Sequence, residues 1–273
     1  MTFDPAPGDN PYELDDYELD KPDLPGEVIV GEEVEDVLDV LASDLLIHAA
    51  NCVRSFGDFH LALCGGATPI PLYRRLMLDP AFRAMPWRRT HLWLVDERRV
   101  PFEHEASNWR LIRELLGDHA DIPTPQLHPI FAMAEDADAA YENELKETLA
   151  WREKGHDRLD YVLLGVGADG HVASIFPDSD LVRERRRFVR LSCTETAAES
   201  DRVTMTLHLI NAARFISVFV TGEQKHPAVQ RLAQREESLH TLPARGLKPI
   251  QGELKWYLDR AAASGQSRIV QEG

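Results

Sequence analysis

The stretch of residues 161–171 reads YVLLGVGADGH, and it decides the fold class. Its first four residues are an apolar run of strand length, and the glycine-rich segment after them can turn sharply and present polar side chains. Three further apolar runs are also followed by polar or glycine-rich segments, at residues 61–64, 91–95 and 216–220. Helical patterns lie between these runs at residues 71–78, 108–116 and 137–151. The alternation predicts an α/β fold with an open, mostly parallel, doubly wound sheet flanked by helices.

The composition of the chain limits its partners and its domain organisation. Its 273 residues include 30 Lys and Arg against 46 Asp and Glu, which gives a net charge of −16. Such a field repels polyanions, so we expect neither a nucleic-acid nor a membrane partner. Residues 1–26 are acidic and rich in proline, which predicts a flexible tail, and residues 27–273 are expected to form a single α/β domain. Apolar spacing predicts a further helix over residues 34–52.

Cysteine usage and the lack of targeting signals predict a cytoplasmic protein. The three cysteines, Cys52, Cys64 and Cys193, form no CxxC pair. The N-terminus does not resemble a signal peptide, and no apolar stretch approaches the roughly 20 residues that a bilayer span needs. The sequence leaves the oligomeric state open between a monomer and a small homo-oligomer.

Four segments are expected to meet at one edge of the sheet, because ligands of open α/β sheets bind beyond the carboxyl ends of the strands. They are residues 65–69, 96–98, 165–171 and 221–225. In the first, two glycines, a threonine and a proline stand between a strand and a helix, which favours binding of a phosphate by main-chain N–H groups. An ordinary tight turn would give the same pattern.

The glycine-rich segment at residues 165–170 matches the GxGxxG pattern of dinucleotide sites. It lies past the middle of the chain and is soon followed by Pro177, whereas a dinucleotide fingerprint opens a long helix in the first βαβ unit. We therefore interpret it as a loop that presents Asp169 and His171. A histidine beside an acid can accept a proton near neutral pH, which makes His171 the candidate general base; the alternative is a loop histidine without a role. Residues 96–98, Asp-Glu-Arg, place two carboxylates and a guanidinium at another strand end. The alternative is an ordinary solvated turn.

Taken together, these segments resemble the 6-phosphogluconolactonase family. The matching motifs, in order, are CGGATP at residues 64–69 with Leu72 and Tyr73, WLVDER at residues 93–98, Ser107-Asn108, LGVGADGHVASIFP at residues 164–177, RVTMT at residues 202–206 and TGEQK at residues 221–225. The resemblance covers residues 27–262. It implies hydrolysis of 6-phospho-D-glucono-1,5-lactone to 6-phospho-D-gluconate in the oxidative pentose phosphate pathway. The small phosphosugar lactone would be the partner, and neither a cofactor nor a metal ion is expected.

The resemblance also implies roles for particular residues. His171 would take a proton from water, Asp169 would orient its ring, and Arg98 would stabilise developing negative charge. The phosphate would lie on the backbone of Gly65, Gly66, Ala67 and Thr68 with Arg202 and Lys225 as cationic partners, and Asp96, Asn108 and Gly167 would complete the substrate site.

Two alternatives differ in class. Glucosamine-6-phosphate deaminases are similar, but they carry Asp-Glu-Tyr where this chain has Asp96-Glu97-Arg98, and Asn-Glu-Pro where it has residues 174–177. A non-catalytic phosphosugar-binding regulator would need the phosphate loop without His171.

Overall fold

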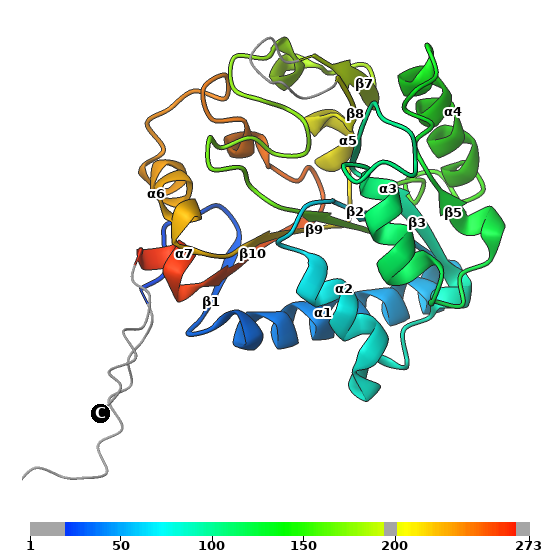
Figure 1. Cartoon of the computed structure of the whole chain (residues 1–273), viewed down its shortest axis with the longest axis horizontal. Helices are drawn as coiled ribbons and strands as arrows, with labels where there is room; N and C mark the ends of the chain where they lie inside the picture. The colour runs from blue at the N-terminus through cyan, green and yellow to red at the C-terminus, as the bar shows by residue number, and fades with distance from the viewer. Residues whose placement is uncertain (1–19, 194–200, 266–273) are drawn as a thin grey trace, which may run out of the picture.

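The apolar runs of the sequence form the centre of a seven-stranded parallel sheet in a computed structural model that describes residues 20–193 and 201–265 (Figure 1). The spatial order of the strands is β1-β10-β9-β6-β2-β3-β5. Their bounds are Glu27–Gly31 for β1, Phe59–Leu63 for β2, Thr90–Leu94 for β3, Leu127–His128 for β5, Tyr161–Leu164 for β6, Phe215–Val220 for β9 and Glu253–Asp259 for β10. The predicted fold class is confirmed, since every pairing in this sheet is parallel.

Helices connect the strands and cover both faces of the sheet (Figure 1). The α-helices are α1 (Val34–Phe56), α2 (Ile70–Leu78), α3 (Asn108–Ile112), α4 (Ala137–Leu149), α5 (Leu207–Ile210), α6 (His226–Gln234) and α7 (Arg260–Ser264). The predicted helices at residues 34–52, 71–78 and 137–151 correspond to α1, α2 and α4. The pattern at residues 108–116 is α3 followed by a π-helical turn, η3 (Arg113–Gly117). Short 3-10 turns are η1 (Pro80–Phe82), η2 (Trp87–Arg89), η4 (Thr124–Gln126), η5 (Asp180–Arg183), η6 (Glu223–Lys225) and η7 (Pro243–Gly246).

A second, antiparallel sheet lies beyond the carboxyl end of β3. It has the order β4-β8-β7, with β4 at Asp96–Arg98, β8 at Arg202–Met205 and β7 at Val189–Ser192. The two sheets are joined where the main-chain N–H of Val95 donates to Leu63 O and that of Met205 donates to Val95 O. The small sheet was not predicted, because its strands are only three or four residues long and carry polar side chains.

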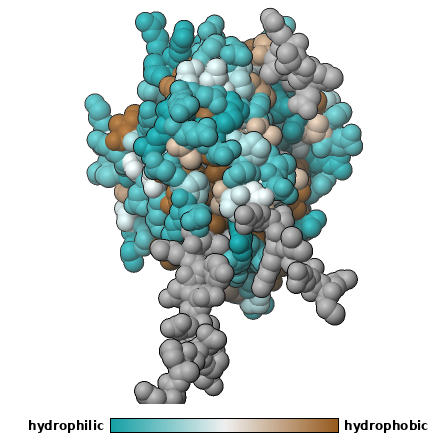
Figure 2. Space-filling model, turned by 90° about the vertical axis from the view of Figure 1, so that its left-hand side faces the viewer, coloured by the Kyte–Doolittle hydropathy of each residue, from teal (hydrophilic) through white to brown (hydrophobic). Residues whose placement is uncertain are grey.

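The core lies on both faces of the large sheet. Its largest fully buried side chains include Trp93, Trp256, Tyr73 and Tyr161. The face drawn in Figure 2 is mostly hydrophilic, with apolar side chains in small scattered groups. In residues 20–193 and 201–265, no helix is long and apolar enough to cross a lipid bilayer.

The end of the expected N-terminal tail packs on the domain. Leu24 is only 5% exposed within the core cluster, and the carbonyl of Pro25 accepts a hydrogen bond of 2.8 Å from the Trp256 indole. Leu24 and Pro25, which the composition assigned to the tail, therefore contact the core in the structure. The earlier part of the predicted tail, residues 1–19, lies outside the described residues.

Candidate active site

A cleft lies at the point where the strand order of the large sheet reverses. From β2 the chain proceeds through β3 to β5 at one edge, and then returns to β6 on the other side of β2. The loops after β2 and β6 consequently diverge, and a crevice of this kind is where open α/β proteins bind ligands. A cavity of about 340 Å³ occupies it.

The loop after β2 forms one wall of the cleft. Residues 65–69 all line it, just before the start of α2. Only glycine fits at position 65, because a Cβ atom there would lie 1.9 Å from Asn108 Oδ1. The absence of a side chain thus lets the loop after β2 lie against Asn108.

Asp96, Arg98 and Asn108 form a hydrogen-bonded group on the adjoining wall. Arg98 donates to Asn108 Oδ1 at 2.8 Å, and Asn108 Nδ2 donates to the main-chain carbonyl of Asp96 at 2.8 Å. The Asp96 carboxylate accepts from the hydroxyl of Ser174 at 2.5 Å. Because Asp96 and Asn108 are buried, this network holds them in fixed orientations.

Glu97 lies behind this group and attaches it to the start of α3. Its carboxylate accepts from the main-chain N–H groups of Asn108 and Trp109, both at 2.8 Å, and from the Ser107 hydroxyl at 3.0 Å. Burial raises the pKa of Glu97, and the N–H groups around it oppose that rise. A carboxylate at this helix terminus satisfies main-chain donors that would otherwise lack partners.

His171 and Asp169 form a pair on the loop after β6. His171 Nδ1 lies 2.7 Å from Asp169 Oδ1. Burial alone would raise the pKa of Asp169, but the hydrogen bonds from His171 outweigh it and hold the pKa at about 2. Gly167 makes room for the pair, because a Cβ atom there would lie 2.1 Å from the His171 ring. An ionised Asp169 accepts the Nδ1 proton, which leaves Nε2 as a proton acceptor.

Two cations reach the cleft from other elements. Arg202 is the register partner of Arg98 in the pairing of β4 with β8, and its guanidinium lies 5.5 Å from the centre of the Phe176 ring. Lys225 is the last residue of η6. Burial lowers the pKa of Lys225, and the charge of Asp169 opposes that shift. Together the two side chains give the cleft a local positive charge within an acidic protein.

The cleft gathers all but one of the residues predicted for the site. Those lining it are Gly65, Gly66, Ala67, Thr68, Asp96, Arg98, Asn108, Gly167, His171, Arg202 and Lys225. Asp169 instead contacts the cleft through His171. The sequence did not point to Glu97 as an anchor, to Ser174 or to Phe176, whose ring centre is 4.7 Å from that of His171. Ser174 and Phe176 lie within the LGVGADGHVASIFP motif, so the sequence marked this segment but did not indicate what these two side chains contact.

The fold and the site define an open α/β protein with a glycine-rich loop and a histidine–aspartate pair at its carboxyl edge. The chain belongs to the family described as glucosamine-6-phosphate isomerases/6-phosphogluconolactonase, whose model matches residues 32–256. This confirms the resemblance found in the sequence.

Known relatives differ in how much of their own length matches this chain. The 6-phosphogluconolactonase of Synechocystis sp. is 38% identical over 210 residues, which cover 76% of this chain and 84% of the relative. The human GDH/6PGL endoplasmic bifunctional protein is 34% identical over 269 residues, or 96% of this chain, but the match spans only 33% of the human protein. A crystal structure of 6-phosphogluconolactonase from Thermotoga maritima superimposes with a TM-score of 0.71 at 26% identity, covering 85% of this chain and 99% of that structure.

Proposed function

We propose that the protein hydrolyses 6-phospho-D-glucono-1,5-lactone to 6-phospho-D-gluconate, a step of the oxidative pentose phosphate pathway. The observation that carries the proposal is one cleft lined by His171, which is paired with Asp169, by a glycine-rich loop and by three cationic side chains, those of Arg98, Arg202 and Lys225. The relatives named 6-phosphogluconolactonase support the same reaction.

His171 is the general base of the proposed mechanism. With the Nδ1 proton engaged by Asp169, Nε2 takes a proton from water as the water oxygen bonds to the lactone carbonyl carbon. The carbonyl oxygen then carries negative charge, which the Arg98 guanidinium stabilises. When this intermediate collapses, the bond to the ring oxygen breaks and the protonated His171 returns the proton to that oxygen. Water is consumed, and the ring opens to a hydroxyl group and a carboxylic acid, which releases its proton to solvent and becomes the carboxylate.

The phosphate group would be held away from the reacting carbonyl. Main-chain N–H groups of residues 65–68, with Arg202 and Lys225, supply the donors and the positive charge that a phosphate requires. Asp96, Asn108 and Gly167 would line the part of the cleft that receives the sugar ring. None of these steps needs a cofactor, because a δ-lactone is a reactive ester.

The test is the disappearance of freshly prepared 6-phosphoglucono-δ-lactone, measured against its spontaneous hydrolysis. We expect a rate that rises in proportion to protein concentration. A parallel assay for ammonia released from glucosamine 6-phosphate covers the deaminase alternative. Ammonia release without lactone hydrolysis would refute the proposal, and binding of phosphosugars without either activity would favour the regulator.

A cytoplasmic location is part of the proposal and rests on the cysteines. Cys52, Cys64 and Cys193 are all free, and the first two are buried. Free thiols are typical of reducing compartments. We further propose that the protein acts as a monomer or small homo-oligomer.

A further inference from the structure

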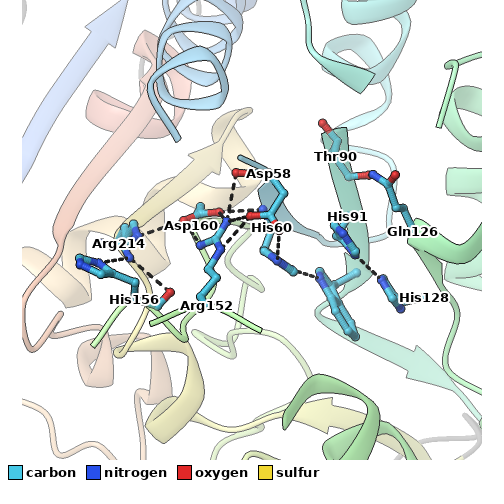
Figure 3. Close-up of polar contacts among 11 residues, drawn as sticks. Asp58, His60, Thr90, His91, Gln126, His128, Arg152, His156, Asp160 and Arg214 are labelled. Atoms are coloured by element: carbon cyan, nitrogen blue, oxygen red, sulfur yellow. Dashed lines mark hydrogen bonds and ion pairs between the residues drawn. The ribbon is translucent and has the colours of Figure 1, made fainter. Parts of the chain in front are cut away.

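A cluster of three potential metal ligands lies at the amino-terminal ends of β2 and β3 (Figure 3). Asp58 directly precedes β2, His60 lies in β2 and His91 lies in β3, where the parallel register pairs the two histidines. One ligand atom from each of the three residues lies within 4.8 Å of the other two. Because the strands are parallel, their amino-terminal ends meet here, far from the loops that line the cleft.

His60 has a ring nitrogen that the surrounding protein leaves unsatisfied. The residue is 1% exposed, and its Nε2 atom has no hydrogen-bond partner among the described residues. Asp58 Oδ2 lies 3.6 Å from it, which is too long for a hydrogen bond. Two ligands on a tetrahedral ion with bonds of about 2.1 Å are separated by roughly 3.4 Å. The gap between these atoms therefore fits a bridging ion better than a direct contact.

His91 is oriented by a chain of hydrogen bonds from α4. Glu144 Oε1 lies 2.6 Å from His128 Nδ1, and His128 Nε2 lies 3.0 Å from His91 Nδ1. A carboxylate accepts the Nδ1 proton of His128, so a neutral His128 accepts at Nε2 from the Nδ1 proton of His91. The Nε2 lone pair of His91 is then available to a metal ion. Carboxylate–histidine chains of this kind orient metal ligands in known sites.

The charges around the cluster can accommodate a cation. Arg152 donates to Asp58 and to Asp160, and Arg214 also donates to Asp160. These two guanidinium groups balance the two carboxylates. Glu144 and Glu147 then leave an excess of negative charge on the adjacent face of α4, and the Arg152 contacts orient the Asp58 carboxylate.

Solvent ions can reach the cluster. A cavity of about 420 Å³ is lined by Asp58, His91, Glu147, Thr148 and the exposed Trp151. An ion entering this cavity would contact Asp58 and His91, which lie within 4.8 Å of a ligand atom of the buried His60.

We propose that Asp58, His60 and His91 bind one divalent first-row transition-metal ion such as Zn²⁺, with solvent completing the coordination. Two imidazoles and one carboxylate suit Zn²⁺, Co²⁺ or Ni²⁺, whereas Mg²⁺ and Ca²⁺ prefer oxygen ligands. Trp93 Nε1 donates to His60 Nδ1 at 3.1 Å, which places the proton of a neutral His60 on Nε2. Binding at Nε2 requires this proton to move to Nδ1 and the Trp93 hydrogen bond to break, which opposes binding and lowers the affinity of the site.

Calorimetric titration of the chelator-treated full chain with Zn²⁺ tests the proposal. We expect one ion per chain for the wild type, and an affinity at least tenfold lower for His91→Gln and for Asp58→Asn. Glu144→Gln alters a positioning residue and is expected to weaken binding about tenfold. His119→Gln, an exposed histidine elsewhere, and His171→Gln, in the active site, are the controls and should bind as the wild type does.

The melting temperature gives an independent readout. Zn²⁺ should raise it in the wild type and in both controls, by mass action, but not in His91→Gln. Melting in the presence of chelator shows whether each variant is folded. Binding that survives both His91→Gln and Asp58→Asn, binding lost in His171→Gln, or no stoichiometric binding by the wild type would each overturn the site. Turnover on the lactone should be the same with and without the ion, since the cluster lies away from the cleft.

Discussion

The bond between His171 and Asp169 determines which nitrogen of the imidazole can act as a base. Because the pKa of Asp169 is about 2, its carboxylate is charged at any pH near neutrality and keeps the Nδ1 proton in place. We predict that His171→Ala lowers kcat by about 10²–10⁴-fold with little change in KM, as loss of a general base does. Asp169→Asn should lower kcat by a smaller factor, because the base remains and only its orientation and tautomer suffer. Steady-state kinetics decide this, and full turnover by His171→Ala would refute the role.

Arg202 and Lys225, the two cations assigned to the phosphate, should matter for binding the phosphate group and not for binding the sugar ring. Each charge-assisted hydrogen bond contributes about 1.5–3 kcal/mol, and a tenfold change corresponds to about 1.4 kcal/mol. We therefore predict that Lys225→Ala and Arg202→Ala each lower kcat/KM for the phosphorylated lactone by about tenfold to a hundredfold. Unphosphorylated glucono-δ-lactone provides the comparison and should be affected little. Equal losses for both substrates would mean that these side chains serve the fold or the chemistry instead.

At the scale of elements, Glu97 couples β4 to α3. Its carboxylate accepts main-chain N–H bonds from the first two residues of the helix, and Asn108, the first of them, accepts a bond from Arg98. In Glu97→Gln, an amide NH₂ would face these donors, so the helix start and Asn108 must shift. We predict a loss of about tenfold to a hundredfold in kcat/KM with a folded protein. Kinetics and the melting temperature, measured together, check this; a variant that loses stability but keeps kcat/KM would contradict it.

The hydrogen bonds of Glu142, which attach α4 to the residues around β7, should make the free energy of unfolding depend on pH in the acid range. Burial by itself would raise the pKa of Glu142, but hydrogen bonds from Lys146, Arg187 and the N–H groups of Phe188 and Val189 outweigh it and lower the pKa to about 2 from 4.5. A carboxyl with a lowered folded-state pKa stabilises the protein fully above 4.5, and this contribution is lost as pH falls from 4.5 to 2. Glu142→Gln should therefore cost about 2–4 kcal/mol at pH 7. As the pH falls from 4.5 to 2, the free energy of unfolding should decrease less in Glu142→Gln than in the wild type. Denaturant titrations across this pH range would measure the difference.

The elements that the sequence predicted are those with long apolar patterns. The helices α1, α2 and α4 and the central strands were found within a few residues, because burial on a sheet face imposes that periodicity. The histidines of the proposed metal site were not found as a group. His60, His91 and His128 each stand alone in an apolar run, and only the register of β2, β3 and β5 brings them side by side. Information of that kind lies in strand pairing and not in local sequence.

On the scale of the whole molecule, the residues that line the candidate active site could be predicted because they follow directly after the strands. A parallel sheet collects the ends of its strands at one edge, so Gly65, Asp96, Gly167 and His171 had to converge. Glu97 and Ser174 escaped notice because their role depends on contacts across 10 and 78 residues of chain, respectively. The packing of Leu24 was missed for a similar reason: the acidic and proline-rich composition of a segment does not show that one of its leucines fits the core.

That leucine leads to the last prediction, which concerns how far the domain extends. Leu24 is buried in the core and Pro25 accepts the Trp256 indole hydrogen bond, whereas the exposed pair of Asp23 with Arg235 should contribute little. Removing a buried leucine costs about 2–5 kcal/mol, and each kcal/mol shifts the melting temperature of a domain of this size by about 2–4 °C. Deleting residues 1–26 should therefore lower the melting temperature by roughly 5–15 °C, with turnover retained below the transition. Leu24→Ala in the full chain should reproduce most of the loss, and Asp23→Ala should melt close to the wild type. If the deletion variant and the wild type melt within a degree of each other, the packing of Leu24 does not stabilise the domain.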